Sequence, residues 1–247
     1  EVAWYDTYPN NDNNNFNGCW GVYKFSSGKI IGSDMSSGLV AIKTTLALAN
    51  SQYLDVKIAV EGLLEYGIHT SIDSLEVKIK SSVPPFATVY SQIALIDSLT
   101  LVARISPQLQ VGNYYIVIGS KNSLETWSRP GGEPLGNGNY FYDFTTSASQ
   151  AYGNNMVLKD GLYCIYSGNV NGDNVIDAED LLAVDNAVFN YASGTSVANL
   201  NGDNIVDIED MAICDNNARA IRIVERPGSL ELFKIGTAKL NPNFQKH

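Results

Sequence analysis

The sequence contains nearly the same acidic stretch of twelve residues twice, as NVNGDNVIDAED at residues 169–180 and as NLNGDNIVDIED at residues 199–210. Residues 169–188 and 199–218 are identical at ten of their twenty positions. Asn and Asp fill positions where a hydrophobic core would need apolar side chains, so the stretches serve another purpose. A pair of related copies indicates two structurally equivalent units.

Oxygen ligands at alternating positions, followed by a carboxylate at position 12, are what a hard cation such as Ca²⁺ requires. We therefore predict two calcium ions, each held by side chains at positions 1, 3, 5, 9 and 12 and by the backbone carbonyl at position 7. The predicted ligands are Asn169, Asn171, Asp173, Val175, Asp177 and Asp180 in the first copy and Asn199, Asn201, Asp203, Ile205, Asp207 and Asp210 in the second. The plainer alternative is a pair of Asx-rich turns that only cap helices.

Two other positions of the repeat carry structural expectations. Position 6 is Asn174 or Asn204, and Asn tolerates the left-handed backbone conformation needed there better than most residues do. Position 8 is Ile176 or Val206, which suits a residue that joins paired loops to a core.

The net charge of −10 is concentrated around the repeats. Between Asp160 and Arg219 there are ten acidic residues and no Lys or Arg. A segment of one charge sign repels itself unless cations occupy it. The same negative charge disfavours nucleic-acid binding.

Residues 39–167 are predicted to form strands. Short runs rich in β-branched and aromatic residues recur between turn signals, as in LDVKIAVEG (54–62), SLEVKIKS (74–81) and NYYIVIGS (113–120). Seven or eight such strands favour an immunoglobulin-like antiparallel β-sandwich. The expected organisation is mainly β, with an N-terminal extension (1–38), the sandwich (39–167), a small helical module (168–227) in which each unit is a loop followed by a helix, and a strand-like tail (228–247).

Residues 168–220, including the helical patterns LLAVDNAVFNY and MAICDNNARAI, resemble a dockerin type I module. Repeats of that family read D-x-N-x-D-G-x-[IV]-[DN]-x-x-D, each followed by one helix. The resemblance implies a module that folds with calcium and binds a cohesin-like partner. Its recognition residues would be Ala178, Glu179, Ile208 and Glu209. The preceding β-region resembles a domain found before dockerin-like repeats in large bacterial cell-surface proteins, which implies an extracellular location.

Catalysis finds little support in the sequence. The only histidines are His69 and His247, and neither is expected to act as a positioned base. Cys19, Cys164 and Cys214 allow at most one disulfide. The aromatic side chains that could stack on sugar rings are Trp127, Tyr140, Phe141 and Tyr142, which leaves a carbohydrate-binding module as an alternative.

The ends of the chain suggest assembly. Glu1 opens the sequence without Met or a leader, so we expect a mature, secreted chain with no transmembrane segment. The tail LELFKIGTAKL carries apolar residues at strand-like spacing (Leu230, Leu232, Phe233 and Ile235), and EVAWYDTY at the N-terminus is a competing strand donor. We predict a non-catalytic, calcium-binding surface protein that self-assembles into a filament or surface layer by strand exchange. The alternatives are docking to a cohesin-like partner and carbohydrate binding.

Overall fold

The computed structural model describes residues 19–24, 29–34, 38–43, 52–71 and 73–228. By its internal contacts the chain divides into two units, Glu1–Ser51 and Gln52–His247. In the first unit, β1 (Cys19–Lys24), β2 (Lys29–Asp34) and β3 (Gly38–Lys43) form an antiparallel sheet in the order β1-β2-β3.

The predicted domain boundaries stay predictions, but one predicted strand pairs in a different sheet from the one we expected. Residues 39–43, which we expected at the start of the sandwich, lie in β3 and pair with β2 in the N-terminal unit. An apolar run with strand character does not specify which sheet the strand joins, because that depends on residues distant in sequence.

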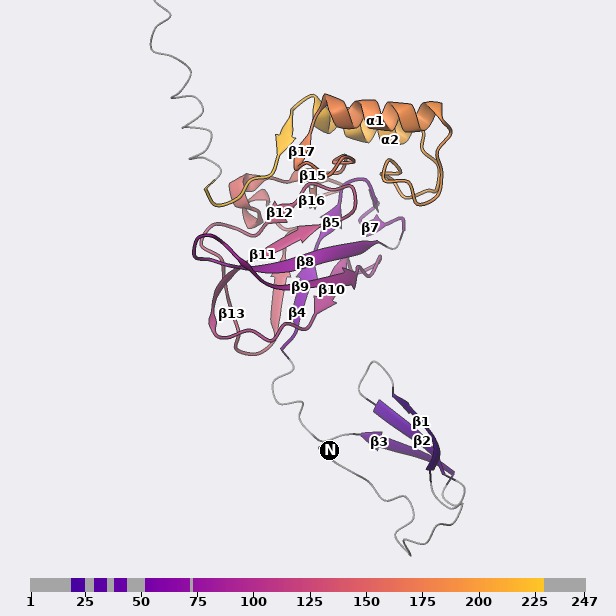
Figure 1. Cartoon of the computed structure of the whole chain (residues 1–247), viewed down its shortest axis with the longest axis vertical. Helices are drawn as coiled ribbons and strands as arrows, with labels where there is room; N and C mark the ends of the chain where they lie inside the picture. The colour runs from indigo at the N-terminus through magenta and orange to yellow at the C-terminus, as the bar shows by residue number, and fades with distance from the viewer. Residues whose placement is uncertain (1–18, 25–28, 35–37, 44–51, 72, 229–247) are drawn as a thin grey trace, which may run out of the picture. The chain divides into compact units, whose positions relative to one another are not determined.

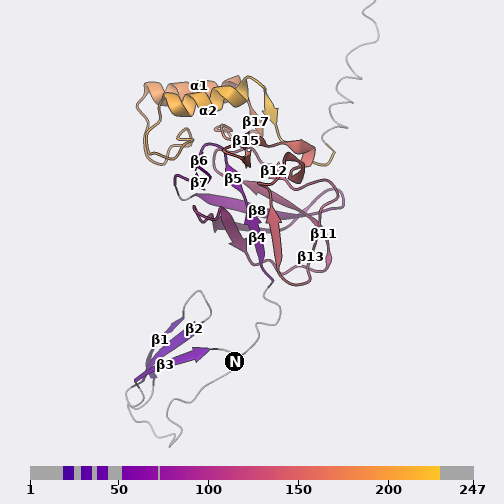
Figure 2. The same cartoon turned by 180° about the vertical axis from the view of Figure 1, so that it is seen from behind.

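The second unit is mainly β and contains two sheets with a shared core (Figure 1). One sheet has the order β10-β4-β14, from Val102–Ile105, Leu54–Lys57 and Tyr140–Asp143. The other has the order β12-β11-β8-β9, from Thr126–Trp127, Gly112–Gly119, Ser74–Ser81 and Thr88–Leu95, with β13 (Glu133–Leu135) also paired to β11. Seen from behind, β4 lies across β8 (Figure 2), so the layers form a β-sandwich.

The sandwich core follows from strand alternation. Along β8, Leu75, Val77 and Ile79 are fully buried, and the residues between them lie on the opposite face. They pack with buried residues of β4 and β11 in one cluster. Each fully buried aliphatic side chain contributes about 1.5–3 kcal/mol of transfer free energy, so this cluster is the main source of the sandwich's stability.

The prediction of a purely antiparallel sandwich was wrong in two places. β14 pairs with β4 in parallel, and β16 (Leu162–Ile165) pairs in parallel with β5 (Ala59–Val60). β15 (Val157–Lys159) extends this small sheet, and β6 (Leu64–Glu65) and β7 (Ile68–His69) form a hairpin. Long connections separate β4 from β14 and β5 from β16, so each later strand can return in the direction of the earlier one. The immunoglobulin-like topology stays a prediction.

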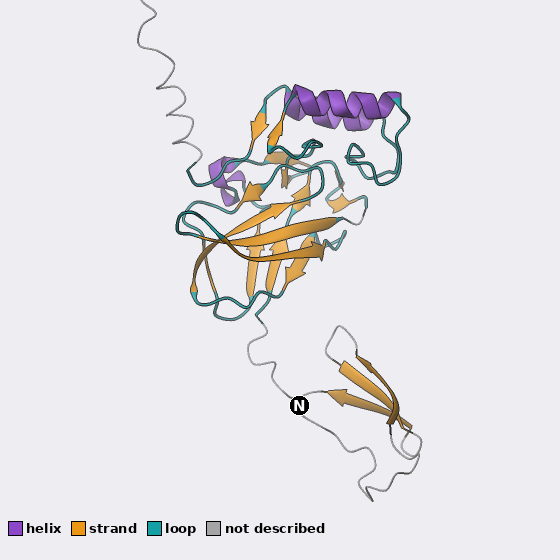
Figure 3. Ribbon diagram, viewed as in Figure 1, coloured by secondary structure: helices purple, strands orange, loops and turns teal. Residues whose placement is uncertain are grey.

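The helices lie at one end of this unit. Two short 3₁₀ helices, Ala148–Gln150 and Tyr152–Asn154, connect β14 to β15. The α-helices are α1 (Ala178–Phe189) and α2 (Ile208–Ala218), which lie side by side (Figure 3). Among the described residues, no helix has both the length and the apolar composition needed to cross a membrane.

A second core joins the helices to the sandwich. β11 is buried on both faces in its middle, because Ile116 and Ile118 face the sandwich core while Tyr115 and Val117 face the second core. The second core also contains Trp127, and it includes Val184 of α1 and Cys214 of α2. One strand therefore connects the sandwich to the acidic repeats.

Candidate metal-binding loops

The two acidic loops adopt the same hydrogen-bonded conformation. At position 1, Asn169 Oδ1 accepts a hydrogen bond from Gly172 N at 3.1 Å, and Asn199 Oδ1 accepts one from Gly202 N at 2.8 Å. At position 5, Asp173 and Asp203 each accept from the backbone N–H two residues ahead, at 2.9 and 2.8 Å. These are Asx turns, in which a short polar side chain fixes its own backbone.

The backbone at position 6 confirms the expectation for asparagine. Asn174 and Asn204 both have φ of 71°, in the left-handed region. Gly172 and Gly202, two residues earlier, both have φ of 76°. The loops are therefore folded alike at the positions where an L-residue is most restricted.

Position 12 closes each loop onto its helix. The Asp180 carboxylate is fully buried and accepts hydrogen bonds from the backbone N–H groups of Val170, Asn171 and Asp177, at 2.8, 3.1 and 3.1 Å. Asp210 repeats this in the second loop, accepting from Leu200, Asn201 and Asp207 at 2.6, 3.0 and 3.0 Å. Burial raises the pKa of Asp210, and the backbone hydrogen bonds oppose that rise.

Each loop runs directly into a helix, as predicted. Asp177 and Asp207 are the N-caps of α1 and α2, and each forms a capping box with the Asp three residues later. The apolar residues at position 8, Ile176 and Val206, are buried in the second core, as expected for residues that join paired loops to a core.

The donor set suits a hard cation, but ligation itself stays a prediction. Each loop offers amide, carboxylate and carbonyl oxygens and no soft ligand, which is the chemistry that Ca²⁺ prefers. Within the described parts of the chain, no three or more His, Cys, Asp or Glu side chains form a group able to hold a metal ion. Any site here must therefore also use asparagine and backbone oxygens, as the predicted ligand set does.

Four of the predicted partner residues are available on the surface. Ala178, Glu179, Ile208 and Glu209 are all exposed in the first turns of the two helices. The tail residues Leu230, Leu232, Phe233 and Ile235 lie outside the described residues.

Sequence reasoning missed an apolar face on α1. The side chains of Leu182 and Phe189 are 59% and 79% exposed, although both belong to the apolar pattern that predicts the helix. With Ala178 and the exposed Asp185 they lie on one face, opposite the fully buried Val184. The sequence already indicates this exposure, because Leu182 and Val184 are two residues apart, and residues at that spacing point to nearly opposite sides of a helix.

Sandwich residues hold the start of both loops, and no local motif reveals them. The carbonyl oxygen of Asn122 accepts from Gly168 N and Asn169 N, at 2.8 and 3.1 Å. The side-chain Nδ2 of the same residue donates to Val197 O at 3.0 Å and to Asn199 O at 3.2 Å. Thr70 Oγ1 donates to Asn201 O at 3.0 Å.

A buried polar network fastens α2 to the sandwich. Asn217 Nδ2 donates to Glu61 Oε2 at 2.6 Å and to Ser167 O at 2.8 Å, and Ser167 N donates to the same carboxylate oxygen at 3.1 Å. Burial raises the pKa of Glu61, and the hydrogen bonds from Asn217 and Ser167 oppose this.

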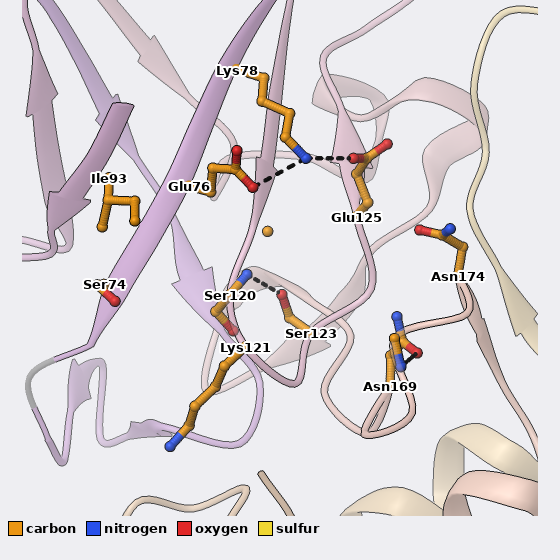
Figure 4. Close-up of a pocket in the computed structure, with 12 residues that line it drawn as sticks. Ser74, Glu76, Lys78, Ile93, Ser120, Lys121, Ser123, Glu125, Asn169 and Asn174 are labelled. Atoms are coloured by element: carbon orange, nitrogen blue, oxygen red, sulfur yellow. Dashed lines mark hydrogen bonds and ion pairs between the residues drawn. The ribbon is translucent and has the colours of Figure 1, made fainter. Parts of the chain in front are cut away.

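The first loop also borders a polar pocket of about 350 Å³ (Figure 4). On the sandwich side, Lys78 Nζ lies 3.1 Å from Glu76 Oε2 and 3.3 Å from Glu125 Oε2. Asn169 and Asn174 line the opposite side. The side chains of Glu76, Lys78 and Glu125 therefore neutralise one another on this side of the pocket.

The residues considered for catalysis and sugar binding have structural roles. His69 is buried, accepts a hydrogen bond from Val60 N at Nε2, and has a pKa lowered to about 4 by burial. Trp127 and Tyr142 are buried and therefore cannot stack on a sugar, whereas Phe141 is 61% exposed. Cys164 and Cys214 are free thiols whose pKa burial raises to about 12. His247 lies outside the described residues.

Proteins similar to this chain were found among solved structures. No family model and no curated protein matches the chain. Chains from two crystal structures of mutant type II cohesin–X-dockerin complexes of Acetivibrio cellulolyticus match with TM-scores of 0.42 and 0.41. Their sequence identities are 14% and 15%, and each match covers 71% of this chain and 96% of the other. Likeness at this level establishes neither a shared fold nor a shared function.

Proposed function

We propose that this chain is a non-catalytic, calcium-dependent docking module, in which a β-sandwich carries a dockerin-like pair of loops and helices. The observation that supports this best is the equivalence of the two loops, which share their Asx turns, left-handed residues and buried position-12 carboxylates. Turns that only capped helices would need the Asp at position 9. The loops also carry oxygen-bearing side chains at positions 1, 3 and 5, the alternating pattern that a calcium site requires.

Calcium would act on folding as well as on binding. The acidic segment 161–218 has no basic residue, so two divalent cations would remove most of its self-repulsion. A ligand that binds only the folded state adds about 2.7 kcal/mol per site when its concentration is a hundred times the dissociation constant. An extracellular location, where calcium is abundant, fits this requirement.

The docking surface we propose lies on the helices. Ala178, Leu182 and Phe189 are exposed on one face of α1, around Asp185, and Ile208 is 74% exposed at the start of α2. Exposed apolar side chains gathered on one helix face favour a protein partner. A cohesin-like domain is the partner that the repeats suggest.

The test separates calcium binding from docking. Isothermal titration calorimetry of the whole chain with CaCl₂ should give two calcium ions per molecule, and Asp180→Asn or Asp210→Asn should each remove one. Titration with a panel of purified cohesin domains, in calcium and in EGTA, should then give binding in calcium alone. A chain that binds no calcium at millimolar concentration would refute the proposal.

One observation favours a second function, self-association by strand addition. β9 is the last strand of its sheet in the described part of the chain, and Val89, Ile93 and Leu95 are 51%, 71% and 69% exposed. Such an edge can accept a strand from another molecule, and the predicted donors are the tail at 230–240 and the competing N-terminal segment EVAWYDTY at 1–8. Light scattering should show large assemblies in calcium that dissolve in EGTA and that disappear when residues 230–247 are deleted. A monomer in both conditions would exclude this function.

A further inference from the structure

The two acidic loops are alike inside but differ in what surrounds them. Their hydrogen bonds at positions 1 and 5 and their left-handed backbone angles match. At position 3 they differ, because Asn171 Nδ2 donates to Asp173 Oδ2 at 3.1 Å whereas Asn201 Nδ2 donates to Glu209 Oε2 at 3.4 Å. The larger difference lies in the sandwich residues that contact each loop.

The second loop rests on the sandwich along its first four positions. At position 2, Leu200 is 1% exposed and belongs to the second core. Its carbonyl lies so close to Gly62 that a Cβ on Gly62 would be 2.2 Å from the Leu200 oxygen. At position 4, a Cβ on Gly202 would lie 2.3 Å from Ser71 Oγ, so the loop backbone there lies against the Ser71 side chain.

Two sandwich side chains hold the carbonyl groups of this loop. Asn122, which is 4% exposed, donates through Nδ2 to Asn199 O at position 1. Thr70 Oγ1 lies 3.0 Å from Asn201 O at position 3 and 3.1 Å from Leu63 O, so its single proton is shared between the loop and the sandwich. Both bonds fix the backbone of residues that are predicted to supply ligands.

The first loop is more open at the equivalent positions. Val170 at position 2 is half-buried, and Asn171 and Gly172 at positions 3 and 4 are exposed, whereas Asn201 and Gly202 are half-buried. On the side of this loop, only the backbone carbonyl of Asn122 takes part, accepting hydrogen bonds from Gly168 N and Asn169 N. The side chain of Asn122 thus acts on the second loop alone.

We infer that the sandwich pre-organises the second loop through Asn122 and Thr70, so that 199–210 is the tighter of two unequal cation sites. This inference rests on the proposed calcium binding. A loop already ordered before the ion arrives loses less conformational freedom on binding, so more of the interaction free energy appears as affinity. Asn122 and Thr70 are positioning residues, since they touch the loop backbone and not the ion.

The experiment isolates each loop in the whole chain. Asp173→Asn leaves the second loop intact, and Asp203→Asn leaves the first. Calorimetric titration with CaCl₂ should give an affinity about tenfold higher for Asp173→Asn than for Asp203→Asn. Adding Asn122→Ala, which loses two hydrogen bonds, should weaken calcium binding about tenfold in the Asp173→Asn background and leave it unchanged in the Asp203→Asn background.

Controls distinguish loop positioning from general damage. Asn139 is the control residue, because its side chain accepts a hydrogen bond from the backbone N–H of Tyr53, at the start of β4 and β14. Asn139→Ala should change the calcium affinity of neither loop. Thr70→Val should weaken the second loop about threefold, and Thr70→Ser, which keeps the hydroxyl, should not. Circular dichroism checks that each variant is folded.

The calorimetric results distinguish a failure of the proposed calcium binding from a failure of the inferred difference between the two loops. If no variant and no wild-type sample binds calcium, the proposed function is wrong. If both loops bind with equal affinity, or the first loop binds more tightly, calcium binding stands and the inference is wrong. An equal loss of affinity in both loops on Asn122→Ala would also overturn it.

Discussion

Replacing Gly62 by alanine tests whether the second loop really rests on the sandwich. The added Cβ would lie 2.2 Å from Leu200 O and 2.9 Å from its carbonyl carbon. Real Cβ atoms essentially never approach within 3.0 Å, so the two backbones must separate by at least 0.8 Å, the difference between 3.0 and 2.2 Å. Overpacking of this kind costs about 1–3 kcal/mol.

The assay is thermal unfolding in calcium and in EGTA. A loss of about 2 kcal/mol lowers the melting temperature by roughly 4–8 °C in a unit of this size. We expect a loss in EGTA as well, because the sandwich holds the second loop in place before the ion binds. Gly119→Ala is the matched control, since its Cβ would meet only Glu125 Cα at 3.9 Å, an ordinary contact. A Gly62→Ala protein as stable as wild type in calcium would show that loop and sandwich are not in contact.

Three further predictions address pH, the position-12 carboxylates and docking. Burial lowers the pKa of His69 from 6.5 to about 4, so the unfolded chain takes up a proton at this residue before the folded chain does as the pH falls. The free energy of unfolding should therefore drop by about 3 kcal/mol between pH 6.5 and pH 4. Urea unfolding should show a smaller drop for His69→Gln. Asp210→Asn places an amide next to the backbone N–H groups that the carboxylate accepts from, so the free energy of unfolding in urea should fall by about 1–3 kcal/mol even in EGTA. A loss seen only in calcium would mean that the carboxylate serves the ion alone. Leu182→Asp should abolish binding to a cohesin domain in titration calorimetry. The melting temperature should not change, because the Leu182 side chain is 59% exposed. An unchanged affinity would place the docking surface elsewhere.

The sequence predicts the loops and helices well because their determinants are local. Asx turns and capping boxes join residues two or three positions apart, so a twelve-residue stretch contains nearly all the information that they need. The strand predicted over residues 74–81 coincides with β8, since its alternation is also a local property.

The contacts that position the loops could not be predicted in this way. Asn122 and Asn199 are 77 residues apart in sequence, and Thr70 and Asn201 are 131 apart. Neither Asn122 nor Thr70 lies in a motif, and each would pass as ordinary turn chemistry. The parallel pairing of β14 with β4 escaped prediction for the same reason, because alternation marks a strand without naming its neighbour.

The network around Glu61 shows why the sandwich and the helices should behave as one body. A buried carboxylate is costly unless its oxygens are hydrogen-bonded, and Glu61 obtains its partners from Asn217 of α2 and from Ser167. If α2 separated from the sandwich, Asn217 would leave Glu61, and the nearby Leu200 would be exposed from the second core. Loop order, helix docking and sandwich stability are therefore linked, so a cation that orders the loops would stabilise residues well beyond the acidic repeats.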